Sequence, residues 1–374
     1  MREILFAARI PAIAAVAWLA LFGWPTEVVA ELGQVPDAIR FGNGANDPDG
    51  LLRVVTPPDA LRWREKVRSI LWGGDPPSVN RVTTSVFEHD AGSIIGRAPR
   101  SSEWLHYRGD GVAPSRAIYV QTKQPASDCL FLYHAGHRDG FIVRPHDPYT
   151  NTRFYFPIGA RKLVQRVAAA GCDLLLFSMP LDGENRYLSN FAGLTHDGLG
   201  KMKPANGSAL RYFVDPVLVI LSHTRAMRGY TRIAMAGLSG GGWTTTMVAA
   251  IEPNVGYAYS VAGSLPNYLR QGKDLGDWEQ TGASELWSTI DYLDLYLMGV
   301  AEPSRRATHF WLRHDTCCFK ADVAIEFAAP LRRHAQKKGF GPLQFLVDTT
   351  YVGHDVTEAI TDRILADITN GMSP

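Results

Sequence analysis

The chain has 374 residues, of which 46% are hydrophobic and 20% are charged, and its formal net charge is +1. This is a globular composition with enough apolar residues for a large core. The near-neutral charge gives no electrostatic reason to expect nucleic acid or an anionic surface as a partner.

The first thirty residues have the layout of a secretory signal peptide. Two arginines form a basic start, and the uncharged, apolar residues 10–24 follow. Residues 28–30, Val-Val-Ala, fit a small-residue cleavage site at the end of segment 1–30. We therefore predict an exported protein, periplasmic or secreted, with no stable membrane span after cleavage. The alternative is a membrane anchor formed by residues 10–24. Residues 31–374 are expected to form the folded domain.

The first part of this domain is expected to contain antiparallel strands. Residues 81–88 and 116–122 alternate polar and apolar side chains and are rich in β-branched residues, which is typical of strands. Asp110-Gly111 marks a turn between them. Before them, residues 61–71 are expected to form a short helix that ends at Gly73.

From Cys129 onward, short apolar runs alternate with helical segments. The expected strands are residues 129–133, 173–177, 233–236, 257–262, 308–312 and 343–348. The expected helices are residues 158–170, 209–227, 321–337 and 356–369, besides one that begins after residue 239. Continuous apolar strands are typically covered on both faces. The alternation therefore predicts an α/β fold with a mostly parallel sheet, helices on both faces and the antiparallel strands at the N-terminal edge.

Residues 266–306 interrupt the alternation with aromatic and acidic side chains. One interpretation is a cap-like insertion over the carboxyl end of the sheet, and the other is a pair of ordinary surface helices. A long polar loop, residues 181–207, is the other irregular segment. Aromatic side chains of these two segments are candidates to line a pocket: Tyr187, Phe191, His196, Trp278 and Trp287.

The four cysteines fall into two pairs. Cys129 and Cys172 each begin an apolar run, so they could be neighbours at one end of the sheet, and Cys317 and Cys318 are adjacent. Oxidation after export would allow two disulfides, and buried free thiols are the alternative. The C-x-x-C spacing of zinc sites does not occur in the sequence.

The segment 230–246, YTRIAMAGLSGGGWTTT, passes from an apolar run through a tight glycine-rich turn into a helical segment. Ser239 stands at the apex of the turn. Gly237 and Gly241 lie two residues away on either side, where larger side chains would collide with the strained backbone. This G-x-S-x-G pattern is typical of a nucleophile elbow, in which helix N-terminal N–H groups face the atom that the serine attacks.

A serine hydroxyl needs a base, and the base needs a third group to fix its tautomer. Asp315 and His354, like Ser239 and His134, follow the carboxyl ends of expected strands, and those ends meet at one edge of a parallel sheet. Asp291, Asp294 and Asp355 compete for the role of the acid. Asp355 adjoins the histidine and could instead cap the last helix.

With serine, acid and histidine in this order, residues 80–370 or so resemble the α/β-hydrolase superfamily. The resemblance implies Ser239 as the nucleophile, His354 as the general base and Asp315 as the residue that orients the imidazole. It also implies an oxyanion hole that contains the N–H of Gly240. The second N–H would come from Gly136 or His137, because Ala135 displaces the family's usual His-Gly pair.

The resemblance further implies a serine hydrolase that cleaves a carboxylic ester or related acyl bond of a small molecule through an acyl-enzyme, without a cofactor. One alternative is a peptidase or amidase with the same triad, and another is a non-catalytic binding protein with this fold. No metal is expected, because the spacing of His134, His137 and Asp139, with His146 and Asp147 nearby, departs from the binuclear metallohydrolase pattern. The glycine run fits no nucleotide-binding pattern.

Overall fold

The protein is described from a computed structural model, which covers residues 32–34, 51–74, 76–109, 112–122, 128–142, 155–186, 188, 195–202, 204–270, 276–319 and 321–370. The predicted signal peptide, residues 1–30, lies outside these ranges, as do Tyr187, Phe191, His146 and Asp147. Among the described residues, no helix is both long enough and apolar enough to cross a bilayer.

The core of the molecule is one sheet of ten strands in the order β1-β10-β9-β8-β7-β5-β6-β4-β3-β2. Strands β5 to β10 form the parallel centre, whereas β2, β3 and β4 form an antiparallel edge. The strands are β1 (Leu32–Gln34), β2 (Val82–Val86), β3 (Ser101–Tyr107), β4 (Ser115–Gln121), β5 (Cys129–His134), β6 (Asp173–Phe177), β7 (Arg232–Leu238), β8 (Tyr257–Val261), β9 (Arg306–His314) and β10 (Leu343–Val352).

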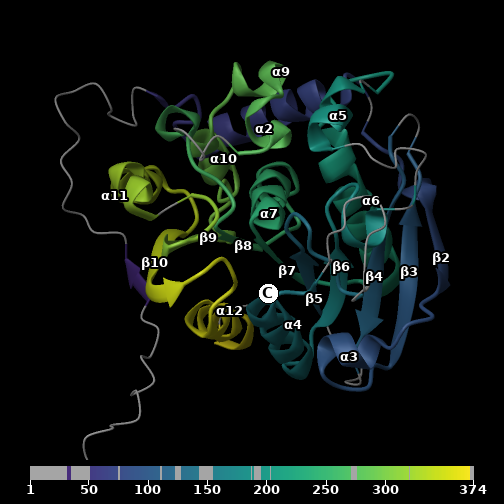
Figure 1. The fold of residues 1–374 in the computed structure, drawn as a ribbon. Helices are drawn as coiled ribbons and strands as arrows, with labels where there is room; N and C mark the ends of the chain where they lie inside the picture. The colour runs from purple at the N-terminus through teal and green to yellow at the C-terminus, as the bar shows by residue number, and fades with distance from the viewer. Residues whose placement is uncertain are drawn as a thin grey trace, which may run out of the picture.

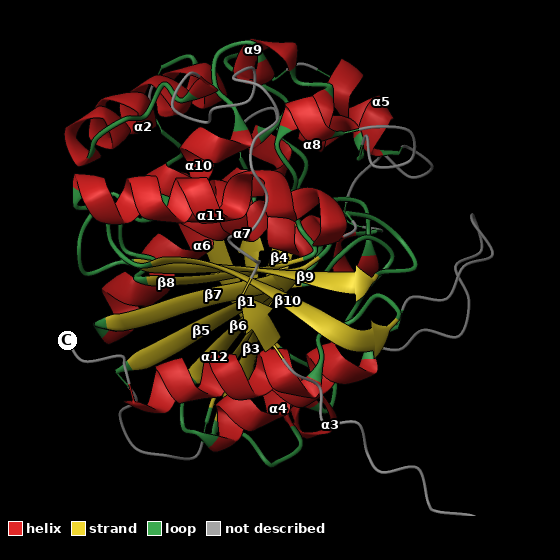
Figure 2. Cartoon of the chain, turned by 90° about the vertical axis from the view of Figure 1, so that its left-hand side faces the viewer, coloured by secondary structure: helices red, strands yellow, loops and turns green. Residues whose placement is uncertain are grey.

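Helices cover both faces of the sheet (Figure 1, Figure 2). In Figure 2, α3, α4 and α12 lie below the sheet, and α2, α6, α7, α10 and α11 lie above it. The α-helices are α2 (Pro57–Trp72), α3 (Ala91–Ile95), α4 (Ile158–Ala169), α5 (His196–Lys201), α6 (Arg211–Arg228), α7 (Gly240–Ile251), α8 (Trp278–Thr281), α9 (Ser284–Trp287), α10 (Tyr292–Met298), α11 (Ala321–Lys338) and α12 (Glu358–Asn370). Short 3₁₀ turns occur at Val79–Arg81, Gly183–Asn185 and Asn267–Leu269.

The predicted mixed sheet is confirmed, and its centre follows from strand composition. Every residue of β5, β6 and β8 is buried, as expected for apolar strands covered on both faces. The central strand β5 has β6 on one side and β7 on the other. The chain thus leaves β5 and β7 in opposite directions, and such a switch point places the loops after both strands beside one crevice.

The antiparallel edge differs from the prediction in one strand. Residues 82–86 and 115–121 are strands as expected, but they do not pair with each other, because β3 (Ser101–Tyr107) lies between them. The sequence SSEWLHY of β3 carries polar side chains at its partly exposed positions and has no continuous apolar run. Its pattern is therefore weak, and pairing with neighbours on both sides stabilises it. At the opposite edge, β1 pairs antiparallel with β10.

Both cysteine pairs are disulfides. Cys129 at the start of β5 is bonded to Cys172, which directly precedes β6, so the predicted proximity at one end of the sheet is confirmed. Cys317 and Cys318 form a vicinal disulfide in the loop after β9. The first bond closes a separation of 43 residues and the second a separation of 1, so only the first constrains the chain over a long range.

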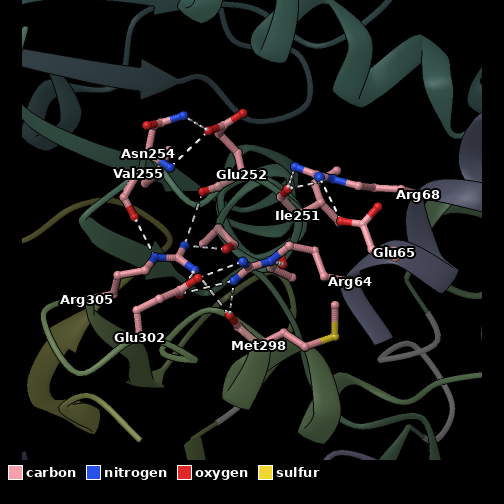
Figure 3. A network of polar contacts seen from close by, with 12 residues as sticks. Arg64, Glu65, Arg68, Ile251, Glu252, Asn254, Val255, Met298, Glu302 and Arg305 are labelled. Carbon is pink, nitrogen blue, oxygen red and sulfur yellow. Dashed lines mark hydrogen bonds and ion pairs between the residues drawn. The ribbon is translucent and has the colours of Figure 1, made fainter. Parts of the chain in front are cut away.

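A cluster of arginines holds the carboxyl end of α7, the helix that follows Ser239 (Figure 3). Arg64 Nε donates to the carbonyl of Ala250 at 3.0 Å, and Arg68 Nε donates to that of Ile251 at 3.1 Å. Glu302 accepts hydrogen bonds from both Arg64 and Arg305. Cations and donors at a helix C-terminus satisfy its unpaired carbonyls and complement its dipole.

Candidate active site

Ser239 has the backbone geometry expected of a nucleophile elbow. It lies between β7 and α7 with φ 58° and ψ −123°, a conformation that a non-glycine residue rarely adopts. A Cβ on Gly237 would lie 2.2 Å from the carbonyl oxygen of Gly241, and one on Gly241 would lie 1.9 Å from that of His134. The predicted strand, turn and helix are confirmed, and the glycines are required by close backbone contacts.

Asp315 and His354 form a hydrogen-bonded pair. Nδ1 of His354 lies 2.8 Å from Oδ2 of Asp315 and 3.0 Å from Oδ1. The Asp315 side chain is fully buried, and its Oδ1 also accepts from the N–H groups of Cys317 at 2.7 Å and Cys318 at 3.1 Å. The loops after β9 and β10 supply the two residues, so adjacent parallel strands bring them together.

The other ring nitrogen of His354 is available for proton transfer. Nε2 is buried and has no hydrogen-bond partner among the described residues, the Ser239 hydroxyl included. Ser239 itself is partly exposed. Hydrogen bonds between a nucleophile and its base are often long before substrate binds, so a ring with one nitrogen anchored and the other free is chemically suited to act as a base.

The three competing aspartates have structural partners elsewhere. Asp291 is the N-cap of α10, and Asp294 accepts from the N–H groups of Arg53 and Val54, both at 2.8 Å. Asp355 accepts from Gly159 N–H at 2.8 Å and therefore binds the amino end of α4. The expectation that Asp355 caps the last helix was wrong, because α4 lies beside this loop and presents its free amides to it.

The loop after β5 lies directly against the elbow. A Cβ on Gly136 would be 3.1 Å from Cβ of Ser239. The N–H of Gly136 donates to Oδ2 of Asp139 at 3.2 Å, so it already has an acceptor. Burial raises the pKa of Asp139 to about 7, against the lowering effect of that N–H. Among the described residues, the N–H of His137 has no acceptor. The N–H of Gly240 has no partner within its helix either, because Gly240 is the first residue of α7.

The side chain of His137 belongs to a cluster that sequence reasoning did not find. Its Nε2 lies 3.1 Å from Nδ1 of His196 and 2.9 Å from Oε1 of Glu279. Burial alone would lower the pKa of His137, but the Glu279 carboxylate outweighs it and raises that pKa to about 9. The same carboxylate raises the pKa of His196. The three residues are separated by 59 and 142 positions, so no local spacing could have indicated the cluster.

The tryptophans that were candidate pocket residues pack against other elements. The indole of Trp278 lies against Gly200 in α5, where a Cβ would come within 2.2 Å of the ring. Trp287 stacks on Tyr292 with ring centroids 4.5 Å apart. A pocket of about 360 Å³ lies between α2 and α6, and none of its lining residues belongs to the Ser239, Asp315 and His354 group.

Solved structures of similar fold are hydrolases by name. Acetyl xylan esterase 1 from Thermoanaerobacterium sp. JW/SL YS485 is 15% identical, with a TM-score of 0.53 over 85% of this chain and 95% of that one. The glucuronoyl esterase from Solibacter usitatus is 12% identical, with a TM-score of 0.55 over the same two shares. The Pyrococcus horikoshii acylaminoacyl peptidase is 12% identical, with a TM-score of 0.50 over 76% of this chain and 44% of that one.

No protein-family model and no curated protein matches the sequence. At these identities the structural likeness concerns the fold alone. The order of the strands, the elbow after β7 and the likeness to these hydrolases together define the fold: the chain has the α/β-hydrolase fold, as the resemblance in the sequence implied.

Proposed function

We propose that the protein is a serine hydrolase that cleaves a carboxylic ester or a related acyl bond of a small molecule. The observation that carries this proposal is the hydrogen bond between the buried Asp315 carboxylate and Nδ1 of His354. The other ring nitrogen of His354, Nε2, has no partner among the described residues and lies at the same sheet edge as the elbow serine. A binding protein without catalysis would have no need for a strained serine at the same sheet edge as a histidine oriented in this way.

In the proposed reaction, Ser239 Oγ attacks the carbonyl carbon while His354 Nε2 takes the hydroxyl proton. Asp315 holds Nδ1–H and stabilises the imidazolium that forms. The imidazolium then donates its proton to the leaving oxygen, which leaves an acyl-serine. A water molecule, deprotonated by the same nitrogen, attacks the acyl-serine; the imidazolium then returns that proton to Ser239 Oγ as the acid is released. The chain's own side chains supply every proton transfer in this scheme.

The oxyanion hole is proposed to consist of the N–H groups of Gly240 and His137. The amino end of α7 supplies the first donor, and the helix dipole favours negative charge there. The sequence left Gly136 and His137 open as the second donor. The bond between Gly136 N–H and Asp139 favours His137, whose N–H has no acceptor among the described residues.

An ester is preferred to an amide because two of the three similar structures reported above are esterases by name. The peptidase alternative rests on the third, the acylaminoacyl peptidase. Rates on p-nitrophenyl esters of increasing acyl length, measured beside rates on peptide p-nitroanilides, separate the two. Turnover of anilides at rates comparable to esters would favour the peptidase.

A fluorophosphonate probe tests the nucleophile. We expect the probe to label the protein stoichiometrically and the Ser239→Ala variant not to react. Ser264→Ala is a matched control, because Ser264 is a buried serine whose hydroxyl is hydrogen-bonded to Tyr296. Labelling that persists in Ser239→Ala would contradict the assignment.

Export through the N-terminal segment is part of the same proposal. Cleavage after Ala30 would leave β1, Leu32–Gln34, on the mature chain, where it pairs with β10. N-terminal sequencing of the exported protein should therefore begin near Glu31. An intact Met1 on protein from the cytoplasm would contradict export.

A further inference from the structure

Ligand atoms of three side chains converge beside the loop after β5: Nε2 of His137, Nδ1 of His196 and the carboxylate of Glu279. At the rim, Oδ2 of Asp277 lies 3.3 Å from Nε2 of His137. The residues come from three segments: the loop after β5, the start of α5, and α8 with the residue that precedes it. Glu279 is fully buried, His196 is nearly so, and the side chain of Asp277 is 56% exposed.

We propose that His137, His196 and Glu279 form a binding site for a divalent transition-metal ion of the Zn²⁺ type. Imidazole nitrogen and carboxylate oxygen are the ligands that such ions accept, whereas Ca²⁺ and Mg²⁺ prefer oxygen alone. The sequence predicted no metal, because the spacing of the residues near His137 does not fit a known metal-binding pattern. The other two ligands, His196 and Glu279, are remote from His137 in the chain and are brought to it by the tertiary structure.

The distances between the donor atoms fit a four-coordinate ion. With bonds of about 2.0–2.1 Å, a tetrahedral site places its ligand atoms roughly 3.3 Å apart. His137 Nε2 lies 3.1 Å from His196 Nδ1, 2.9 Å from Glu279 Oε1 and 3.3 Å from Asp277 Oδ2. His196 Nδ1 lies 3.2 Å from Glu279 Oε2. The three residues His137, His196 and Glu279 thus have their ligand atoms at spacings close to this value.

Hydrogen bonds within the cluster do not account for all of these atoms. Nε2 of His196 lies 2.8 Å from the carbonyl oxygen of Pro180, which can only accept, so that nitrogen carries the proton. In a neutral ring, Nδ1 of His196 therefore presents a lone pair to the carboxylate and to His137. Glu279 Oε2 is buried and has no hydrogen bond of acceptable geometry among the described residues. A cation at the shared point gives each lone pair a partner.

The hydrogen bond from His196 to the carbonyl of Pro180 is also the kind of contact that supports a metal-binding histidine. Histidines that bind metals usually donate their other ring N–H to a carbonyl or carboxylate, which fixes the tautomer and the ring orientation. His196 has this arrangement. The edge of the His137 ring formed by Cε1 and Nδ1 faces the elbow, since a Cβ on Gly240 would lie 2.6 Å from Cε1 and 2.8 Å from Nδ1. The ion would thus connect α5 and α8 to the loop that approaches Ser239. Any effect on catalysis rests on the proposed function, but the binding itself does not.

Metal content and metal uptake of the full chain test the site. Elemental analysis, followed by titration of chelator-treated protein with Zn²⁺ in a calorimeter, should give one ion per chain. Glu279→Gln keeps the shape of the side chain but removes its charge. The dissociation constant for Zn²⁺ should therefore rise by at least about 100-fold, more than the 10–100-fold loss of affinity that is typical when a residue outside the ligand shell is changed. His89→Ala is the control, since this half-exposed histidine lies outside the cluster.

A second measurement guards against a variant that fails to fold. Co²⁺ added to the metal-free wild-type protein should give the visible absorption of a four-coordinate ion, and one equivalent of Zn²⁺ should abolish it and raise Tm. Absence of stoichiometric Zn²⁺ uptake by the wild-type protein, or equal affinity in Glu279→Gln, would overturn the proposal and leave a proton shared among the three residues. If the wild-type protein binds Zn²⁺ but does not react with the fluorophosphonate probe, the proposed function is refuted and the metal site is not.

Discussion

Replacing Asp315 with asparagine tests whether this carboxylate sets the tautomer of His354. In the native protein, Oδ1 accepts from the N–H groups of Cys317 at 2.7 Å and Cys318 at 3.1 Å, and Oδ2 lies 2.8 Å from Nδ1 of His354. The two backbone donors would hold the asparagine oxygen at the Oδ1 position, so its NH₂ group would point at Nδ1. An NH₂ group only donates, so Nδ1 must become the acceptor and the imidazole proton moves to Nε2.

A protonated Nε2 cannot take the proton of Ser239. The same change of tautomer in a serine hydrolase of another fold costs about 10⁴-fold in kcat. At 1.36 kcal/mol per tenfold, this is a loss of about 5.5 kcal/mol of transition-state stabilisation. We therefore expect kcat on p-nitrophenyl acetate to fall by about four orders of magnitude in Asp315→Asn. Tm should change little, because the side-chain shape and the two backbone hydrogen bonds are kept.

Asp291→Asn is the matched control. Asp291 is the N-cap of α10, and asparagine caps helices as well as aspartate does, so this variant should retain both stability and activity. The reasoning fails if Asp315→Asn keeps kcat within tenfold of the wild-type value. Inactivity of Asp291→Asn or Asp294→Asn, with folding intact, would transfer the role of the acid to that residue.

Three further predictions concern stability. Burial lowers the pKa of His309 to about 3, so the unfolded chain binds a proton first as pH falls below about 6.5, and His309 should cost about 2 kcal/mol at pH 5. Burial lowers the pKa of His134 to about 4 as well, and both the wild type and His309→Phe keep that histidine. In urea unfolding, the wild type should therefore lose about 2 kcal/mol more than His309→Phe between pH 7 and pH 5, and equal losses would refute the prediction. Burial tends to raise the pKa of Glu302, but two arginines outweigh it and lower that pKa to about 2. The stability that Glu302 contributes is thus present above about pH 4.5 and lost as pH falls towards 2. The Tm values of the wild type and of Glu302→Gln should therefore converge between about pH 4.5 and about pH 2. A Tm difference that stays constant over this range would contradict a stabilising role of the ion pairs. Because the Cys129–Cys172 bond closes a separation of 43 residues, its double alanine variant should lose about 2–4 kcal/mol in urea unfolding, and a loss below 1 kcal/mol would exclude a chain-constraint effect.

The sequence by itself determined the centre of the fold and the elbow. Short apolar runs such as residues 129–133 and 173–177 alternate with helical segments, which is typical of strands covered on both faces, and both runs are fully buried strands. Ser239 could be recognised because its glycine neighbours follow from backbone sterics within five residues. The polar strand Ser101–Tyr107 was missed, because its stability comes from two neighbouring strands and its own side chains carry little pattern.

Only the tertiary structure decided which polar groups meet. Asp315 and His354 could be paired by expectation, but their contact at 2.8 Å depends on β9 and β10 lying side by side. The convergence of His196 and Glu279 on His137 follows from loops that meet across the sheet edge. Such contacts join residues that are remote in the chain. Hydrogen bonding and charge act through space, so no sequence interval records them.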